Sequence, residues 1–292
     1  MAEQWKEFDK INLSFIFKKE TPFFLYDFPK LEENLRFLRK FFHQLVDCET
    51  KLYYSSKCNP NHVLLSFLAE RVDGFDCSSE IEILMMNGLR VSANRISISG
   101  PGKTDEVLAL ASREATGCLH LDSVDEYESL IEWRRGHHIH SQTPPLSLRL
   151  QLESEGSKLG MTEHEVSELL SKARPGEFAG LHTYLGREMF SFERFTQHLR
   201  TLEQLIARFQ SAFVSEVKIF LGPGLPSMKA LRNMELPKIP LKCSHPIVFE
   251  IGRSLVADAG YYAAPILTKK ETRHPTIIVN GGVHHLGSPL VS

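Results

Sequence analysis

The chain has 292 residues, of which 42% are hydrophobic, and its 34 basic and 36 acidic side chains give a net charge of −2. The apolar fraction is sufficient for a sizeable core, and the near-neutral charge argues against a polyanionic partner such as nucleic acid. The sequence has no run of about 18 apolar residues, so it predicts no membrane span. Met1–Lys6 lacks the apolar segment of a signal peptide.

The predicted elements begin with a strand-like run at Phe23–Asp27 and a helix from Pro29 to about Leu45, both after a leading segment of residues 5–20. Eight further apolar runs then alternate with helical patterns, and their nearly uniform apolar character indicates burial on both faces of a parallel sheet. The predicted strands are Lys51–Ser56, Gly74–Cys77, Arg95–Ser99, Cys118–Leu121, Leu146–Leu150, Ala179–Tyr184, Val217–Leu221 and Ile247–Glu250.

Helical spacing predicts helices between these strands, including Asn61–Glu70 and Phe192–Ala212. Ser79 and either Asp122 or Ser123 stand where helix N-caps belong. Eight strand–helix units are typical of a (β/α)8 TIM-like barrel, an α/β fold. An open doubly wound sheet is the alternative, although it would not need so many regular units.

The pattern changes after Glu250. Tyr261–Leu267 and Thr276–Val279 are predicted strands, with a turn-like Glu271–Pro275 and no helix between them. We therefore expect a barrel over residues 23–250. We also expect a partial antiparallel β-sheet domain that combines the N-terminal segment, 1–22, with the C-terminal end, 251–292.

The five cysteines have no regular spacing and form no C-x-x-C pair; they are Cys48, Cys58, Cys77, Cys118 and Cys243. An odd, scattered set is typical of free thiols in a reducing compartment rather than of a disulfide framework. We therefore expect a cytoplasmic protein.

Lys57 is the most informative residue, because it closes a predicted strand just before the turn at Asn59-Pro60. Burial at a strand end would lower its pKa and increase the fraction of neutral amine, the form that attacks a carbonyl. Asp76 ends the next strand, and a lysine and an aspartate so placed suggest a Schiff base and its pyridinium partner. The alternative is a frayed lysine and a helix-capping aspartate.

Other polar and glycine residues also collect at predicted strand ends, where a barrel carries its active face. Gly222 and Gly224 would expose backbone N–H groups to a phosphate, and Arg253 would supply a cation. The remaining candidates at strand ends are Arg149, His182, Tyr184, Glu250 and Gly252.

The chain resembles the fold-type III pyridoxal-phosphate decarboxylases, which include ornithine, arginine and diaminopimelate decarboxylases. The matching segments are Tyr54–Pro60, Gly74–Glu82, Ser157–Met161, Gly180–His182 and Glu250–Gly260. The resemblance implies pyridoxal 5'-phosphate as cofactor, Lys57 as its Schiff-base lysine and Asp76 near that linkage. It further implies Glu250 at the pyridine nitrogen, and Arg253 with the glycine loop at the phosphate.

Three residues depart from the family pattern. Pro223 removes one N–H donor from the glycine loop, and Tyr184 stands where many members have a histidine that stacks on the ring. Arg187 stands where a small hydroxyl residue is usual, and it would either add a phosphate contact or crowd the site.

The family's post-barrel sheet is expected to be incomplete, so that the chain is a C-terminally shortened member. Its predicted partners are a small amino-acid substrate and either a second copy, in a homodimer, or a complementing C-terminal chain. His284-His285 does not predict a metal site, because adjacent strand residues point to opposite faces.

Two functions compete. The first is decarboxylation of an amino acid, of the diaminopimelate or ornithine type or linked to a carrier. The second is a truncated, non-catalytic relative that acts as a binding or regulatory partner. A third interpretation is a racemase or a cofactor-homeostasis protein that shares only the barrel. The pairing of Glu250 with Arg253 argues against the racemase.

Overall fold

The structure is a computed structural model that describes residues 22–113, 116–137, 144–152, 159–282 and 285. It divides into two compact units, one of residues 28–258 and one of residues 1–27 with 259–292. Three parts of the sequence predictions lie outside the described residues, namely the leading segment 5–20, Ser157-Lys158 and His284.

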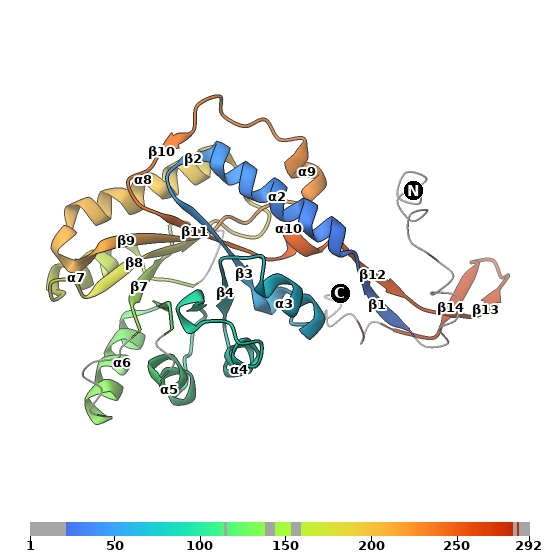
Figure 1. Ribbon diagram of the computed structural model, residues 1–292, viewed down its shortest axis with the longest axis horizontal. Coiled ribbons are helices and arrows are strands. Elements are labelled where there is room, and N and C mark those ends of the chain that lie inside the picture. Colours follow the sequence, from blue (N-terminus) through green and yellow to red (C-terminus); the bar gives the residue numbers. More distant parts are fainter. Residues whose placement is uncertain (1–21, 114–115, 138–143, 153–158, 283–284, 286–292) are drawn as a thin grey trace. The chain divides into compact units, whose positions relative to one another are not determined.

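The larger unit is a closed barrel of parallel strands in the order β11-β3-β4-β5-β6-β7-β8-β9 (Figure 1). Closure comes from the pairing of β11 with β3, in which Phe249 lies opposite Leu52. Each of the eight predicted strands overlaps one of these, so the (β/α)8 barrel is confirmed. The strands are β3 (Thr50–Ser55), β4 (Gly74–Cys77), β5 (Ile96–Ile98), β6 (Cys118–Leu121), β7 (Leu146–Leu150), β8 (Phe178–Tyr184), β9 (Phe213–Gly222) and β11 (Ile247–Ile251).

Helices alternate with the strands and cover the outside of the barrel (Figure 1). Several begin at the side-chain caps that the sequence predicts, because a serine hydroxyl accepts an otherwise unpaired backbone N–H. Ser79 caps one helix, and Ser123, rather than Asp122, caps another. The helices are α2 (Phe28–Leu45), α3 (His62–Ala69), α4 (Glu80–Gly88), α5 (Asp105–Arg113), α6 (Val124–Gly136), α7 (Glu163–Lys172), α8 (Phe192–Arg208), α9 (Met228–Arg232) and α10 (Arg253–Val256).

The core lies on both sides of the barrel wall. Outside it, Phe42 of α2 stacks on Phe249 of β11 with ring centroids 3.7 Å apart. Tyr53, Phe220 and Val248 belong to a second buried cluster. A short parallel pair, β2 (Val46–Asp47) and β10 (Leu241–Lys242), lies just before β3 and β11 in the chain.

The smaller unit consists of two antiparallel strand pairs. β1 (Phe23–Tyr26) pairs with β12 (Gly260–Ala263), and β13 (Ile266–Lys270) pairs with β14 (Thr276–Val279). Antiparallel strand pairs near the two chain ends are therefore confirmed, whereas the expected domain bounds, 1–22 with 251–292, stay a prediction.

Two details of this unit differ from expectation. β1 lies within the range expected for the barrel, but it pairs with β12, because β11 and β3 already close the barrel. The predicted strand Tyr261–Leu267 is divided between β12 and β13 around Pro265, which has no N–H to donate to a ladder. Among the helices described in either unit, none combines the length and the apolar character needed to cross a membrane.

Candidate active site

A cavity of about 580 Å³ opens at the carboxyl ends of the barrel strands. This is the face on which barrels carry their active sites. All ten predicted site residues line it, namely Lys57, Asp76, Arg149, His182, Tyr184, Gly222, Gly224, Glu250, Gly252 and Arg253.

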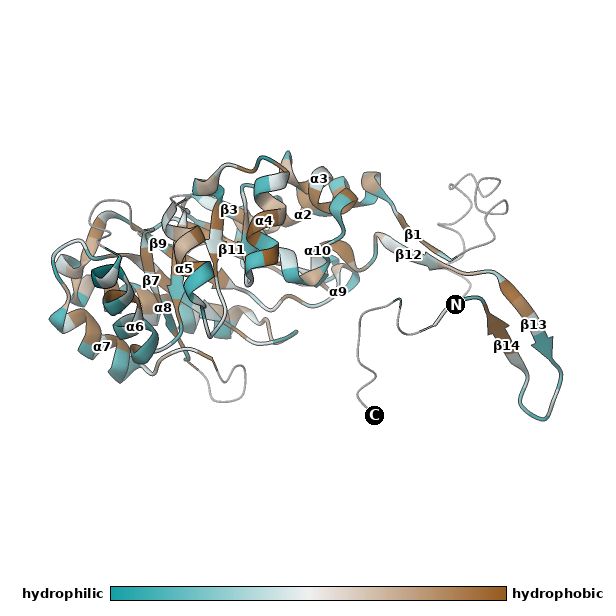
Figure 2. Cartoon of the chain, turned by 90° about the horizontal axis from the view of Figure 1, so that it is seen from below, coloured by the Kyte–Doolittle hydropathy of each residue, from teal (hydrophilic) through white to brown (hydrophobic). Residues whose placement is uncertain are grey.

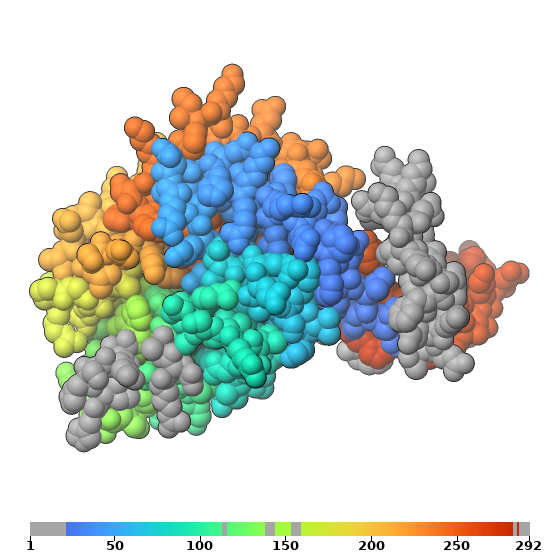
Figure 3. All heavy atoms as spheres, in the orientation of Figure 1, coloured from blue at the N-terminus to red at the C-terminus, as the bar shows by residue number. Residues whose placement is uncertain are grey.

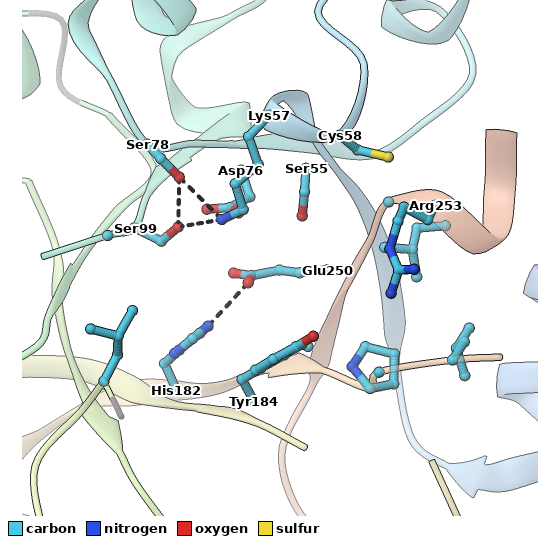
Figure 4. A pocket seen from close by; sticks show the side chains of 18 of the residues that line it. Ser55, Lys57, Cys58, Asp76, Ser78, Ser99, His182, Tyr184, Glu250 and Arg253 are labelled. Carbon is cyan, nitrogen blue, oxygen red and sulfur yellow. Dashed lines mark hydrogen bonds and ion pairs between the residues drawn. The ribbon is translucent and has the colours of Figure 1, made fainter. Parts of the chain in front are cut away.

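Lys57 lies on a single turn of 3-10 helix, Ser56–Cys58, which follows β3 directly. Its ammonium group donates to Asp76 Oδ2 at 3.2 Å, Ser78 Oγ at 3.1 Å and Ser99 Oγ at 3.4 Å (Figure 4). The lysine side chain is 53% exposed, whereas that of Asp76 is 1% exposed. The lysine thus reaches from the rim of the cavity to a buried carboxylate.

The pKa of Lys57 is raised, and the expectation of a lowered pKa is wrong. The charge of Asp76 is the largest cause, and Glu250 acts in the same direction. Burial and the charge of Arg149 act in the opposite direction but are outweighed. Position at a strand end predicts burial, but it does not reveal that a carboxylate lies within hydrogen-bonding distance of the amine. The charged ammonium is therefore the favoured form of Lys57 in this structure.

Glu250 on β11 lies between two histidines. Its Oε2 is 3.0 Å from His182 Nε2, and its Oε1 is 3.3 Å from His120 Nε2. The two imidazole rings stack with their centroids 4.6 Å apart, and the other ring nitrogen of His120, Nδ1, contacts the hydroxyl of Ser147. Figure 4 shows Glu250 between His182 and the group formed by Lys57 and Asp76.

This arrangement keeps Glu250 ionised. Burial alone would raise its pKa, but His182 and His120 together hold it well below its usual range. Burial also acts to lower the pKa of His120, yet Cys118 and Glu250 raise it to about 10. Burial lowers the pKa of His182, more than Glu250 raises it. Two imidazoles, one on β6 and one on β8, therefore support an ionised carboxylate on β11.

Arg149 is buried beside the cavity and forms an ion pair with Asp122, with Nη1 3.0 Å from Oδ1. Register places Arg149 opposite His182 on neighbouring strands. Within the described residues, Arg149 Nε and Asp122 Oδ2 have no hydrogen-bond partner. The ion pair therefore leaves one N–H donor of Arg149 and one acceptor oxygen of Asp122 available beside the cavity.

The glycine loop after β9 brings backbone close to its neighbours. Gly224 has a φ of +59°, and a Cβ there would lie 1.8 Å from the carbonyl oxygen of Gly186. A Cβ on Gly222 would lie 2.6 Å from the ring of Tyr184. Larger residues are excluded at both positions, so the loop presents bare backbone to the cavity.

Arg253 lines the same end of the cavity, and its Nη1 donates to Glu188 Oε1 at 2.7 Å. Glu188 has a φ of +58°, which is unusual for a residue with a side chain. Arg187 is 76% exposed and is not among the described residues that line the cavity. It therefore does not crowd the cavity in this structure.

Four residues at or beneath the cavity were missed by sequence reasoning. Ser78 and Ser99 bind Lys57, and Glu82 accepts from the backbone N–H of Ser78 at 2.9 Å. His120 Nε2 lies 3.3 Å from Glu250 Oε1. A histidine within an otherwise apolar strand was the available signal for His120, because a buried titratable group requires a partner.

The comparisons with known proteins agree with this geometry. The family model described as "Pyridoxal-dependent decarboxylase, pyridoxal binding domain" matches residues 30–257. The chain belongs to the pyridoxal-dependent decarboxylases. It is thus a member of a family of lyases that use pyridoxal 5'-phosphate, as the resemblance implied.

Among the relatives of this chain is the diaminopimelate decarboxylase of Deinococcus radiodurans, 26% identical over 93% of this chain and 70% of that protein. The L-glutamyl-[BtrI acyl-carrier protein] decarboxylase of Niallia circulans is 25% identical over 91% of this chain and 68% of that protein. The fold is also that of Helicobacter pylori diaminopimelate decarboxylase solved with L-lysine, with a TM-score of 0.74 and 22% identity over 92% of this chain and 73% of that one.

The residues of the cavity fit the cofactor of this decarboxylase family. An amine at Lys57 suits the cofactor's aldehyde, and the ionised carboxylate of Glu250 suits a protonated ring nitrogen. Gly222, Gly224 and Arg253 offer backbone N–H groups and a cation to a phosphate. Asp76 Oδ1 is buried and has no hydrogen-bond partner among the described residues, so one further acceptor stays available beside Lys57.

Proposed function

We propose that this chain decarboxylates an amino acid of the diaminopimelate or ornithine type, or a carrier-linked one, with pyridoxal phosphate attached to Lys57 through a Schiff base. The observation that supports the proposal best is the convergence of Lys57, Glu250 and Arg253 with the glycine loop on one cavity. Diaminopimelate decarboxylases, a carrier-linked glutamate decarboxylase and an ornithine decarboxylase are among the relatives.

When bound, the cofactor supplies an electron-withdrawing ring that accepts the electron pair released as CO2 leaves. In our proposal, Lys57 attaches it and Asp76 controls the proton on the lysine. Gly222, Gly224, Gly252 and Arg253 would hold the phosphate. Tyr184 supplies an aromatic face at the cavity wall, since it lines the cavity and is half-buried.

Glu250 would keep a proton on the ring nitrogen, and two histidines would keep the carboxylate of Glu250 ionised and in place. Each carboxylate oxygen faces one imidazole, at 3.0 Å for His182 and 3.3 Å for His120. Because the carboxylate is already ionised and fixed before the cofactor arrives, little rearrangement is needed when it binds. Arg149, ion-paired with Asp122, adds a fixed buried cation at the edge of the cavity.

Labelling tests the attachment site. The protein is incubated with pyridoxal phosphate, reduced with borohydride, digested and mapped by mass spectrometry. We expect the pyridoxyl label on Lys57 and none in Lys57→Ala. Lys51→Ala is the matched control, since Lys51 pairs with Glu49 just before the barrel strand begins. A label elsewhere, or none with the cofactor in excess, would contradict the assignment of Lys57.

Carbon dioxide release tests the reaction and the substrate class. Diaminopimelate, ornithine and a glutamyl-carrier conjugate are each supplied to the protein loaded with pyridoxal phosphate. The protein is tested by itself and together with a C-terminal β-sheet segment from a relative. Release from at least one substrate that is lost in Lys57→Ala supports the proposal. Cofactor attachment without any release would favour the non-catalytic alternative. A gain on adding the segment would support a complementing chain, and a sedimentation experiment would detect a homodimer.

A further inference from the structure

Two cysteines that are distant in sequence lie next to one another beside the amino-terminal ends of the barrel strands. β2 and β10 run parallel, with Asp47 opposite Lys242. The residue that follows each strand is a cysteine, Cys48 and Cys243, so the strand pairing brings the two thiols side by side. Each affects the pKa of the other through a side-chain hydrogen bond, and Cys243 Sγ also lies 3.1 Å from the carbonyl oxygen of His245, to which it donates. Paired strands lie about 4.8 Å apart, which falls within the Cα separation of about 4.4–6.8 Å that a disulfide spans.

Both thiols are free and neither is fully buried. The pKa of Cys48 is lowered, first by its hydrogen bond with Cys243 and also by the backbone of Ile247, against the effects of burial, Glu203 and Asp47. The pKa of Cys243 is raised by the same hydrogen bond and by burial. Cys48 is therefore the better nucleophile, because the thiolate is the reactive form.

We propose that Cys48 and Cys243 are a site of reversible oxidation, at which the folded protein forms an intramolecular disulfide on exposure to a peroxide. The Cys48 thiolate attacks one peroxide oxygen, the O–O bond breaks, and the hydroxide released takes up a proton to become water. The sulfenic acid formed at Cys48 is then attacked by the deprotonated sulfur of Cys243. The S–S bond forms, the S–O bond breaks, and the hydroxide that leaves takes up the proton lost by the Cys243 thiol to become a second water. The two sulfurs supply the two electrons that reduce the peroxide.

The disulfide would join two segments that already touch. Arg232 of α9 lies 2.9 Å from Glu33 Oε1 and 3.2 Å from Asn34 Oδ1, both on α2. In Figure 3, α2 in blue and residues 223–246 in orange lie side by side on one face of the larger unit, as they do in Figure 1. The contacts of Arg232 lie near the start of α2, whereas the disulfide would link the chain just after the end of α2 to the segment that follows α9. It would stabilise the fold chiefly by restricting the unfolded chain.

The site is separate from the cofactor cavity. Cys48 comes just before β3 and Cys243 just before β11, whereas the cavity lies at the opposite ends of these strands. The proposal therefore does not depend on the reaction that the cavity performs. Cofactor attachment at Lys57 should be the same in the oxidised and reduced proteins.

Peptide mapping under non-reducing conditions tests the proposal. The full chain, loaded with pyridoxal phosphate, is reduced, desalted and exposed to hydrogen peroxide; remaining thiols are alkylated in denaturant before digestion. We expect a cross-linked peptide pair containing Cys48 and Cys243, about 2 Da lighter than the two thiol peptides together, which disappears with dithiothreitol. The Tm of the oxidised protein should rise by about 5 °C or more.

Three variants sharpen the test. Cys48→Ser and Cys243→Ser should each abolish the cross-link, and Cys243→Ser should leave a sulfenic acid on Cys48 that dimedone traps. Cys58→Ser is the matched control, because Cys58 is another half-buried thiol, and it should keep the cross-link. The proposal would be overturned if both thiols of the wild-type protein were still alkylated after excess peroxide, or if either formed a cross-link to another cysteine. This outcome is read from the wild-type protein, so it holds even if a variant fails to fold.

Discussion

Single residues in the cavity are paired before any cofactor binds. Lys57 is hydrogen-bonded to Asp76, Glu250 lies between two histidines, and Arg253 donates to Glu188. In the proposed site, Lys57 and Arg253 would exchange part of their present pairing for contacts to the cofactor. The protonation of Lys57 and the charge around Arg253 should therefore govern how readily the cofactor attaches.

Asp76→Asn should move the pH dependence of cofactor attachment to lower pH. Asp76 is the main cause of the raised pKa of Lys57, so its neutralisation makes the reactive neutral amine more abundant at a given pH. The measurement is the rate at which borohydride-trappable label appears on Lys57 as the pH is varied. Ser78→Ala is the control, since it removes a neutral partner of Lys57. An unchanged pH profile in Asp76→Asn would show that this carboxylate does not hold the proton on the lysine.

Glu188→Gln should strengthen binding of pyridoxal phosphate about 1.4- to fivefold, because the carboxylate competes with a phosphate for Arg253 and an exposed ion pair contributes about 0.2–1 kcal/mol. Both side chains are about half exposed, which keeps the effect small. The dissociation constant is measured by fluorescence titration, with the exposed Glu193→Gln as control. Weaker binding would instead show that Glu188 positions Arg253 for the cofactor.

At the scale of elements, β8 and α8 are joined by a buried polar contact. His198 is 2% exposed on the inner face of α8, and its Nδ1 lies 3.4 Å from Thr183 Oγ1 on β8. Burial, with a smaller contribution from Arg194, lowers the pKa of His198 to about 4 from its ordinary 6.5. Burial therefore favours the neutral imidazole of His198, which couples the packing of α8 to pH.

His198→Leu should flatten the pH dependence of stability in the acid range. The unfolded chain binds a proton at His198 near pH 6.5, whereas the folded chain does so only near pH 4. The native contribution is therefore complete above pH 6.5 and is lost as the pH falls towards 4, by about 3 kcal/mol at most. Urea unfolding at several pH values between 7.5 and 4.5 measures this loss. The exposed His43→Gln is the control, and parallel curves for wild type and His198→Leu would refute the explanation.

At the scale of the whole molecule, the smaller unit leaves much of its described apolar surface exposed. Figure 2 shows β13 and β14 as strongly hydrophobic over part of their length. Ile266, Leu267 and Ile277 are 55%, 63% and 57% exposed. A two-stranded sheet also has unpaired edges, which invite pairing with another strand. Self-association through this hairpin is the expected consequence.

Replacing Leu267 and Ile277 by threonine should weaken self-association about tenfold, because threonine keeps the strand propensity while it removes apolar area. Sedimentation velocity over a range of concentrations gives the association constant. Val63→Thr is the control, since Val63 is 57% exposed on the larger unit. Equal association of wild type and the double variant would exclude the hairpin as the contact.

The sequence by itself determined which segments become strands and helices, and which polar residues stand at strand ends. Uniformly apolar runs indicate burial on both faces, and Ser79 and either Asp122 or Ser123 mark helix starts through local hydrogen bonds, of which the structure shows Ser79 and Ser123. Because the carboxyl ends of parallel strands share one face of a barrel, Lys57 and Glu250 could be expected at one cavity.

Only the tertiary structure decided how these residues are charged and paired. Glu250 meets His182 and His120, which lie on two other strands, and Arg253 meets Glu188. Local sequence patterns reflect burial and backbone conformation, whereas a pKa depends on distances between side chains that the fold alone brings together. The same reason explains Lys57, whose raised pKa comes from the carboxylate of a neighbouring strand. Cys48 and Cys243 likewise became neighbours only when β2 paired with β10.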